Sequence, residues 1–169
     1  AAGEIGYLPI GETPLHGNEG PGAFETAVGS MAFTRYAQRP TKQSQRPRQL
    51  ASAHRALLDE IGPAQVFSRA RDGDKAAQAV LTAVLRYLGS GLVAVAAVLN
   101  PELIVLGGGL APSLAPHVSE LQTELETRVP APPRLELSAL ADSAVAVGAV
   151  KRAMSFAEAG LFGAIALRS

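Results

Sequence analysis

The sequence predicts an α/β fold, and three features of its second half carry that prediction. Leu103–Leu106 is a continuous apolar run, typical of a strand in a sheet covered on both faces. An Ala-rich stretch of helical periodicity precedes it and ends near Leu99, and strands and helices alternate after it. With 169 residues, 47% of them hydrophobic, the chain is long enough for one core, which predicts a single domain or one large lobe.

The first part of the chain predicts two elements separated by a loop. Ile5–Ile10 is an expected short strand, and the stretch from there to Gly22 is rich in glycine and proline and is expected to be a loop. Ala23–Tyr36 has apolar residues at roughly helical spacing and predicts a helix. Arg35–Arg48 is polar and basic. We interpret it as a solvated linker rather than a nucleic-acid patch, because aromatic residues do not interleave the basic ones.

The middle of the chain predicts helices. Leu50–Ile61 and Ala64–Arg71 are short amphipathic stretches, and a proline precedes the second, as suits a first helical turn. Asp72–Asp74 then supplies a turn and an N-cap for the long helix that runs to about Leu99.

After the apolar strand, the chain continues the alternation. Gly107–Gly109 is expected to turn the strand into a helix over Ser113–Arg128. Leu135–Ser138 predicts a further strand and Ala144–Phe156 a further helix.

Composition excludes several classes of function. Fifteen basic and fifteen acidic side chains give a net charge of zero, so no overall field draws the chain to nucleic acid or to a membrane. The absence of cysteine excludes disulfides, thiol nucleophiles and cysteine-built zinc sites. The apolar stretch Gly91–Ala111 is interrupted, so a buried helix and a strand are expected there rather than a membrane span. The N-terminus lacks the pattern of a signal peptide, and we expect a cytoplasmic protein whose chain enters here in the middle of a fold.

Two groups of residues are candidates for ligand binding. Gly107, Gly108 and Gly109 follow a buried strand, where backbone N–H groups can approach a phosphate closely. The segment matches neither dinucleotide nor Walker fingerprints, and a tight turn without a ligand is an equal alternative. Glu4 and Glu25 follow glycine-rich loops and could converge on a polyhydroxyl ligand, although surface acids are the more common reading of such spacing. The three histidines do not cluster at metal-ligand spacing, and no metal site is expected.

Taken in order, five segments resemble the family of repressors, open reading frames and kinases known as ROK. The most specific piece, in one-letter code, is N-P-E-x-I-V-L-G-G-G, and the ordered set spans nearly the whole chain. The five segments are Ala2–Tyr7, which resembles the family's A-G-E-I-G-H loop; Gly17–Gly20 with Phe24–Thr26; Asp72–Ala77; Leu99–Leu110; and Ala146–Ala149.

The resemblance implies which fold the protein has and which part of that fold this chain forms. ROK proteins have two actin-like lobes of the actin-like ATPase and ribonuclease H-like fold, with sugar and ATP in the cleft between them. By resemblance, residues 1–169 form a single C-terminal lobe, and an N-terminal lobe and any winged helix-turn-helix lie outside this chain. The family's catalytic aspartate lies upstream, so no catalytic residue is assigned here. Glu4, Tyr7 and Glu25 would contact the sugar, and Gly107–Gly109 would face the nucleotide.

One departure from the family pattern affects its metal site. The family's zinc is held by the histidine of the A-G-E-I-G-H loop and three cysteines. Tyr7 stands at the histidine position, and Pro14, His16 and Pro21 stand near the cysteine positions. No structural zinc is therefore expected. The missing histidine also touches sugar in the kinases, so its replacement favours the regulator branch, while Tyr7 can still hydrogen-bond to or stack on a sugar.

Our leading hypothesis from the sequence is the sugar-sensing and oligomerisation lobe of a ROK transcriptional regulator. Its partners would be a small sugar, further copies of the protein, and DNA only through a domain outside this chain. The alternative is the C-terminal lobe of a glucokinase-like, ATP-dependent sugar kinase without the zinc site, and ATP and magnesium are expected only in that case. A third reading is a degenerate lobe kept for assembly, against which the intact Glu4 and Glu25 argue.

Overall fold

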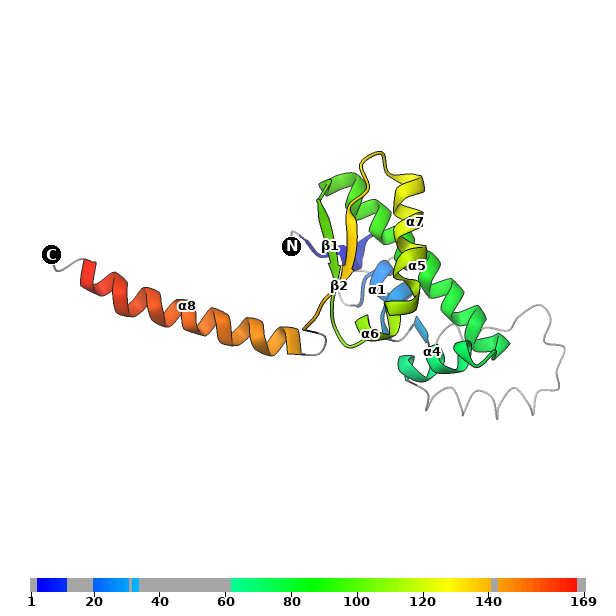
Figure 1. Ribbon diagram of the computed structural model, residues 1–169, viewed down its shortest axis with the longest axis horizontal. Helices are drawn as coiled ribbons and strands as arrows, with labels where there is room; N and C mark the ends of the chain where they lie inside the picture. Colours follow the sequence, from blue (N-terminus) through cyan, green and yellow to red (C-terminus); the bar gives the residue numbers. More distant parts are fainter. Residues whose placement is uncertain (1–2, 12–19, 31, 34–61, 141–142, 167–169) are drawn as a thin grey trace.

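The computed structural model describes residues 3–11, 20–30, 32–33, 62–140 and 143–166. In these residues the chain forms a mixed α/β unit with one long helix standing apart from it (Figure 1). The elements in order are the 3-10 helix η1 (Ile5–Tyr7), α1 (Ala23–Val28), α4 (Pro63–Arg71), α5 (Lys75–Leu99), β1 (Leu103–Leu106), α6 (Ala111–Leu114), the 3-10 helix η2 (Ala115–His117), α7 (Val118–Arg128), β2 (Arg134–Leu137) and α8 (Ala144–Ala166).

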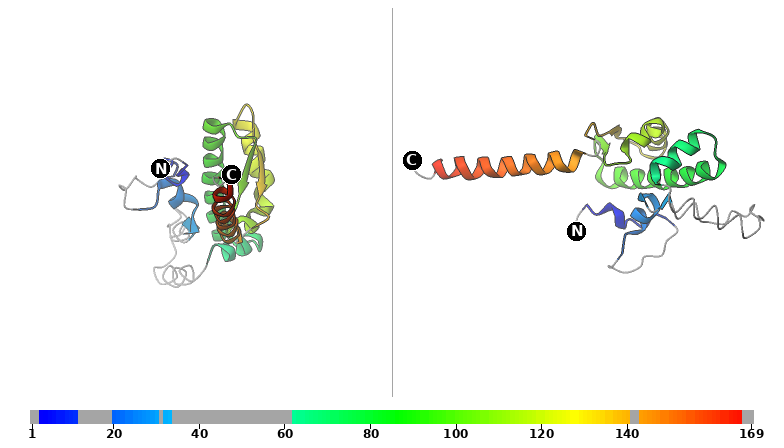
Figure 2. Two further views of the ribbon diagram at one scale, coloured as in Figure 1. Left: turned by 90° about the vertical axis from the view of Figure 1, so that its left-hand side faces the viewer. Right: turned by 90° about the horizontal axis from the view of Figure 1, so that it is seen from below.

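The fold is layered around α5. Strands β1 and β2 pair in parallel, with Leu103 opposite Arg134 and Leu106 opposite Leu137. Side chains of α5, α7 and one face of the sheet share a single apolar core. Helix α1 packs on α5 from another side, and in the right-hand view of Figure 2 the N-terminal elements and the sheet lie on opposite sides of α5. The expected α/β class is confirmed, with α5 as its central helix.

Local chemistry fixes both ends of α5. The Asp74 carboxylate accepts hydrogen bonds from the backbone N–H groups of Ala76 (2.8 Å) and Ala77 (3.2 Å), so it is the N-cap that the sequence predicts. Asn100 ends the helix in the left-handed conformation, with φ 44°. By length and composition alone α5 could cross a membrane, but half of its apolar window is buried inside this fold. A core helix of a water-soluble fold has the same properties, so the helix is weak evidence for a membrane.

Two glycines of α5 allow its neighbours to come close. A Cβ atom on Gly91 would overlap the ring of Phe24 in α1, and one on Gly89 would overlap the carboxylate of Glu124 in α7. A side chain at Gly91 would meet the buried Phe24 ring and push α1 and α5 apart, whereas at Gly89 it would displace only the end of the flexible Glu124 side chain. Gly91 therefore sets the spacing of α1 and α5.

A glutamine of α7 holds the start of β2. The side chain of Gln122 accepts a hydrogen bond from the N–H of Leu135 (2.9 Å) and donates one to the carbonyl of Pro133 (3.2 Å). Pro133 is among the most completely buried side chains of the described residues. The Gln122 amide thus satisfies backbone groups at the point where β2 begins.

The structure contradicts the expected strand over Ile5–Ile10. Tyr7 donates its N–H to the carbonyl of Glu4 (3.2 Å), and Leu8 donates to Ile5 (3.0 Å), so the chain coils into η1. A strand needs a partner for its backbone groups, and the described residues offer none here. The apolar run was too short to distinguish the two conformations.

Two predicted helices are interrupted. Helix α1 ends at Val28 because Gly29 is extended, with ψ 174°, and helical conformation resumes at Ser30, Ala32 and Phe33; residues 31 and 34–36 of the predicted helix lie outside the described residues. The helix expected over Ser113–Arg128 is instead divided into α6, η2 and α7. Pro116 lacks an N–H group and occupies the first turn of η2, so the chain cannot continue as one regular helix.

The other elements agree with the prediction or extend it. Helices α4 and α5 and strand β1 are confirmed, and β2 lies one residue earlier than expected. Helix α8 begins at Ala144 as predicted but continues well beyond Phe156. The predicted linker Arg35–Arg48 and helix Leu50–Ile61 fall outside the described residues.

Within the described residues, one face of the sheet is open. Val105 is 52% exposed and Leu103 37% exposed, whereas Leu135 on the other face is buried. The apolar run of β1 predicts cover on both faces, and parallel sheets nearly always have it. Here α5 and α7 supply it on one side only.

Candidate functional site

The predicted sugar-contacting residues lie on η1 and α1, which pack closely together through two glycines. A Cβ atom on Gly22 would lie 2.6 Å from the Cα of Tyr7, closer than any real Cβ contact. A Cβ on Gly6 would lie 3.4 Å from Oε2 of Glu25. Glycine at both positions therefore brings η1 against the first turn of α1 and places the Glu25 carboxylate beside it.

The polar groups of this cluster are exposed. The Tyr7 hydroxyl donates a long hydrogen bond of 3.4 Å to the carbonyl of Gly20, and about half of its side-chain surface remains open. Glu4 and Glu25 are both exposed. No cation of the described residues forms an ion pair with either carboxylate. As far as the described residues are concerned, both carboxylates can accept hydrogen bonds from the hydroxyl groups of a ligand.

The glycine segment lies at the carboxyl end of β1, as expected. Gly107, Gly108 and Gly109 are exposed, and Gly108 has φ 92°, a conformation that side-chain-bearing residues rarely adopt. The carbonyl of Gly108 accepts a hydrogen bond from Ala111 (3.0 Å), which starts α6. This helix has only four residues, so its dipole is small and would contribute little to binding an anion. Any phosphate contact would come from the backbone N–H groups of the turn itself.

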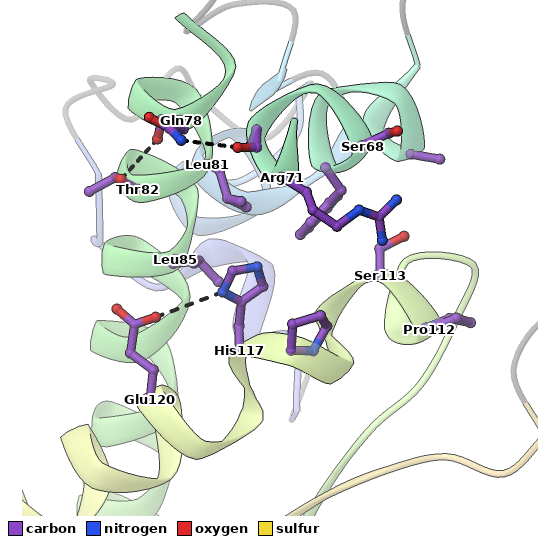
Figure 3. Close-up of a pocket in the computed structure, with 14 residues that line it drawn as sticks. Ser68, Arg71, Gln78, Leu81, Thr82, Leu85, Pro112, Ser113, His117 and Glu120 are labelled. Carbon is purple, nitrogen blue, oxygen red and sulfur yellow. Dashed lines mark hydrogen bonds and ion pairs between the residues drawn. The ribbon is translucent and has the colours of Figure 1, made fainter. Parts of the chain in front are cut away.

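A cavity of about 700 Å³ lies beside α6, the short helix that follows this turn, and its lining includes Pro112 and Ser113 but none of the three glycines (Figure 3). Pro112 and Ser113 of α6 form one wall, and α4, α5 and α7 form the others. The floor is apolar, with Leu81 and Leu85 of α5 and Phe67 of α4. A volume of this size accommodates a molecule as large as a nucleoside.

Polar side chains stand at the rim of the cavity. In Figure 3 the Arg71 side chain extends toward Ser113. His117 lies 3.8 Å from the Glu120 carboxylate, and its ring lies 6.0 Å from that of Phe67, centroid to centroid. The cavity thus offers an apolar floor with one cation, Arg71, and one carboxylate, Glu120, at its rim, and the floor suits a flat, partly apolar molecule.

Sequence reasoning did not find this cavity. The sequence places Arg71 only at the end of the amphipathic stretch Ala64–Arg71, and His117 only within the helix predicted over Ser113–Arg128. The signal that could have found them is Pro116, which breaks the predicted helix next to the cavity that it lines.

The structure brings together the residues within each candidate group, but the sugar-contacting group and the glycine group lie apart. Glu4, Tyr7 and Glu25 lie on elements that contact each other. Gly107–Gly109 lie at the sheet, across α5 from α1 (Figure 2).

Comparison with known proteins finds one matching protein family and several similar solved structures. The sequence profile of the ROK family matches residues 1–156. Among solved structures, a candidate sugar kinase from Cytophaga hutchinsonii is 23% identical with a TM-score of 0.63, over 90% of this chain and 48% of that one. A ROK family glucokinase from Streptomyces griseus, solved with glucose and AMPPNP, is 21% identical with a TM-score of 0.60, over 84% of this chain and 48% of that one.

A third similar structure is the ROK hexokinase from Thermus thermophilus, 23% identical with a TM-score of 0.56, over 84% of this chain and 45% of that one. No curated protein matches the chain. At these identities the likeness shows the fold, which is the actin-like ATPase fold expected from the sequence. The chain spans about half the length of the solved structures it matches.

Proposed function

This chain belongs to the ROK family, and from that premise we propose that it forms the C-terminal lobe of an ATP-dependent sugar kinase. The observation that carries the proposal is the glycine turn at the end of β1, which leads directly into the wall of the 700 Å³ cavity. A phosphate chain beside the turn and a nucleoside in the cavity would be neighbours in one molecule. Two of the similar structures are a ROK glucokinase and a ROK hexokinase, which supports the same activity class.

In this proposal the nucleotide is held by described residues of the cavity and the turn. The apolar floor of Phe67, Leu81 and Leu85 receives the base, and Arg71 at the rim attracts the negative charge of the phosphates. The exposed glycines offer backbone N–H groups without side chains in the way. Phosphoryl transfer depends largely on such positioning, and magnesium would neutralise the phosphates.

The sugar is held by the η1 and α1 cluster. Glu4 and Glu25 accept hydrogen bonds from sugar hydroxyls, and Tyr7 presents a ring face and a hydroxyl. A carboxylate fixes the orientation of a hydroxyl more strongly than a neutral acceptor does. The base that takes the proton from the attacking hydroxyl is assigned to no residue of this chain and would come from an upstream lobe.

The test of activity uses the full-length parent protein. Titration calorimetry with hexoses and N-acetylhexosamines, with and without ATP and magnesium, is combined with an assay of ADP release. The kinase proposal predicts ADP release that depends on one of the sugars. Sugar binding without turnover would contradict it.

A pair of tryptophan variants tests the cavity. Ser113→Trp places a large ring in the cavity and should weaken nucleotide binding by about tenfold or more, while sugar affinity is unchanged. Ser119→Trp, on the exposed surface of α7 outside the cavity, is the matched control and should bind nucleotide normally. Equal nucleotide affinity in both variants would remove the cavity from the proposal.

A pair of glutamine variants tests the sugar cluster. Glu25→Gln keeps the shape of the side chain and removes its charge, which should weaken sugar binding by about tenfold. Glu102→Gln changes an exposed carboxylate next to β1 in the same way and should leave sugar affinity unaltered. If Glu25→Gln also binds sugar as the parent does, the carboxylate has no role in recognition.

One observation favours a second function, the sugar-sensing lobe of a ROK transcriptional regulator. Tyr7 occupies the position that resembles the sugar-contacting histidine of the kinases, and a chain without cysteine has no thiolate donors for the family's zinc. The residues present therefore do not fit that metal site. A sensor would bind sugar with different affinity in two lobe arrangements. Glu4→Ala should then abolish the response of DNA binding to sugar while the fold remains intact.

A further inference from the structure

The junction between η1 and α1 is closed by direct contact between two backbones. A Cβ atom on Gly22, the residue before α1, would overlap the carbonyl group of Gly6 and lie 2.6 Å from the Cα of Tyr7. The atoms in the way belong to the backbone, so no side-chain rotation could make room for it. Any residue other than glycine at position 22 would therefore push η1 away from α1.

Backbone conformation does not explain why position 22 is a glycine. Gly22 has φ −63° and ψ 166°, an extended conformation that other residue types adopt readily. The requirement for glycine comes from the contact alone. Gly20, two residues earlier, also lacks a positive φ, and no atom lies within 4 Å of an added Cβ there. Gly20 is therefore a matched position without the contact.

The same junction fixes the relative placement of two carboxylates. The carbonyl of Gly22 accepts hydrogen bonds from the N–H (2.9 Å) and the hydroxyl (2.8 Å) of Thr26, so Gly22 is bound to the first turn of α1, which carries Glu25. On the other side of the contact, Glu4 is the N-cap of η1. A shift at Gly22 would therefore move Glu25 relative to Glu4.

The residues of the junction do not form a metal site. The chain has no cysteine, and the described residues hold no group of three or more histidine, aspartate or glutamate side chains placed to bind a metal ion. The Tyr7 hydroxyl donates to the carbonyl of Gly20 across the junction (3.4 Å), and a phenol is not among the usual zinc ligands. The contacts that close the junction are made by the polypeptide itself.

We propose that Gly22 is the positioning residue for the Glu4 and Glu25 carboxylates, and that its contact with η1 holds them in place without a metal ion. The inference rests on the sugar-binding part of the proposed function, in which these carboxylates contact the sugar. It adds the residue that aligns them. The proposal predicts that a single methyl group at position 22 impairs sugar recognition without touching the sugar.

Hydrogen exchange in the full-length parent protein tests the junction directly. The backbone N–H groups of Tyr7 and Leu8 donate the hydrogen bonds that form η1. Gly22→Ala should speed their exchange by about tenfold or more, because η1 loses its support, whereas Gly20→Ala should leave it unchanged. Equal exchange rates in the two variants would overturn the proposal.

Titrations of the same variants separate positioning from general damage. The ligands are the hexose or N-acetylhexosamine that the parent binds and, separately, ATP with magnesium. Gly22→Ala should weaken sugar binding by about tenfold or more and leave nucleotide affinity unchanged, while Gly20→Ala should bind both as the parent does. Normal sugar affinity in Gly22→Ala would overturn the proposal.

A milder variant decides the case in which Gly22→Ala does not fold and loses both ligands. A Cβ atom on Gly6 would lie 3.3 Å from the Cβ of Glu25, so Gly6→Ala should displace Glu25 only slightly. We expect a smaller loss of sugar affinity, with nucleotide binding intact. Sugar affinity equal to that of the parent would then contradict the positioning role.

A chelator tests whether the junction works without metal. The parent is dialysed against EDTA, and sugar affinity is measured in the absence of nucleotide. Unchanged affinity is expected, and a loss that Zn²⁺ restores would overturn this part of the proposal. A parent that binds no sugar, but in which Gly22→Ala exchanges faster than Gly20→Ala, would contradict the proposed function and leave the role of Gly22 in the junction standing.

Discussion

Helices α5 and α8 have similar lengths and similar apolar content, but their surroundings are opposite. Helix α5 spans Lys75–Leu99 with ten buried residues, and three layers of the fold contact it or its core. Helix α8 spans Ala144–Ala166 and is exposed on every side that the structure describes. Apolar composition therefore predicts that a helix will be buried in the finished protein, but not which part of the protein will bury it.

The difference has a local cause in the small residues of α5. Gly89 and Gly91 accept the close approach of Glu124 and Phe24, whereas Gly148 and Gly160 of α8 have no atom within 4 Å of an added Cβ. The same residue type thus has a packing role in one helix and none within this chain in the other.

The largest effect is expected from a core truncation in α5. Leu92 is 5% exposed, and Leu92→Ala should lower the free energy of unfolding of the chain by about 3 kcal/mol, because it removes buried apolar surface and leaves a cavity. Urea denaturation followed by circular dichroism measures the change. A loss below about 1 kcal/mol would show that α5 is not the centre of the cooperative core.

Alanine at a glycine should have opposite signs in the two helices. Gly91→Ala places a methyl group on the Phe24 ring and should destabilise the chain by about 2 kcal/mol. Gly148→Ala meets no atom and should stabilise α8 by up to about 1 kcal/mol through helix propensity. Thermal unfolding reports the first, and helix content at low temperature reports the second. If both substitutions raised or both lowered stability, α5 and α8 would not differ in their need for glycine.

A smaller effect is expected at the start of α5. Asp74→Ala removes the side chain that accepts from Ala76 and Ala77, and should cost about 1 kcal/mol of unfolding free energy. Asp74→Asn keeps an oxygen acceptor and is the control, with most of the stability retained. If the two variants lose the same amount, charge rather than capping stabilises this end.

The smallest effect is expected in α8. Met154 is 58% exposed, and Met154→Ala should change the unfolding free energy of the 169-residue chain by less than about 0.5 kcal/mol. The same change in the full-length parent should cost more if a second lobe covers this side. Equal effects in the two proteins would show that this side of α8 is as exposed in the parent as in the 169-residue chain.

The sequence predicted the parts of the fold whose signals are local. The N-cap of α5 at Asp74, the apolar strand β1 and the start of α8 are confirmed because capping and hydrophobic periodicity act over a few residues. The strand over Ile5–Ile10 was wrong because strand formation depends on a distant partner. The break at Pro116 was visible in the sequence, but its consequence, the cavity beside α4, depends on tertiary packing.

The candidate site was predictable only in pieces. Gly6 and Gly22 allow η1 and α1 to approach each other closely. A contact between segments that are separate in the sequence leaves no repeating pattern in it, so the sequence could not predict this one. The exposed turn at Gly107–Gly109 could be placed because it follows a strand with a clear pattern. The roles of these residues stay predictions until sugar and nucleotide binding are measured.

The Gln122 side chain also bears on the order in which the chain folds. Its two hydrogen bonds join residues 11 and 13 positions apart, whereas β1 and β2 pair across the whole of α6, η2 and α7. Closing a short loop costs less conformational entropy than closing a long one. We therefore expect α7 and the start of β2 to associate early, as a local nucleus that presents β2 in the correct alignment before β1 arrives. Gln122→Leu should slow refolding of the chain more than it speeds unfolding.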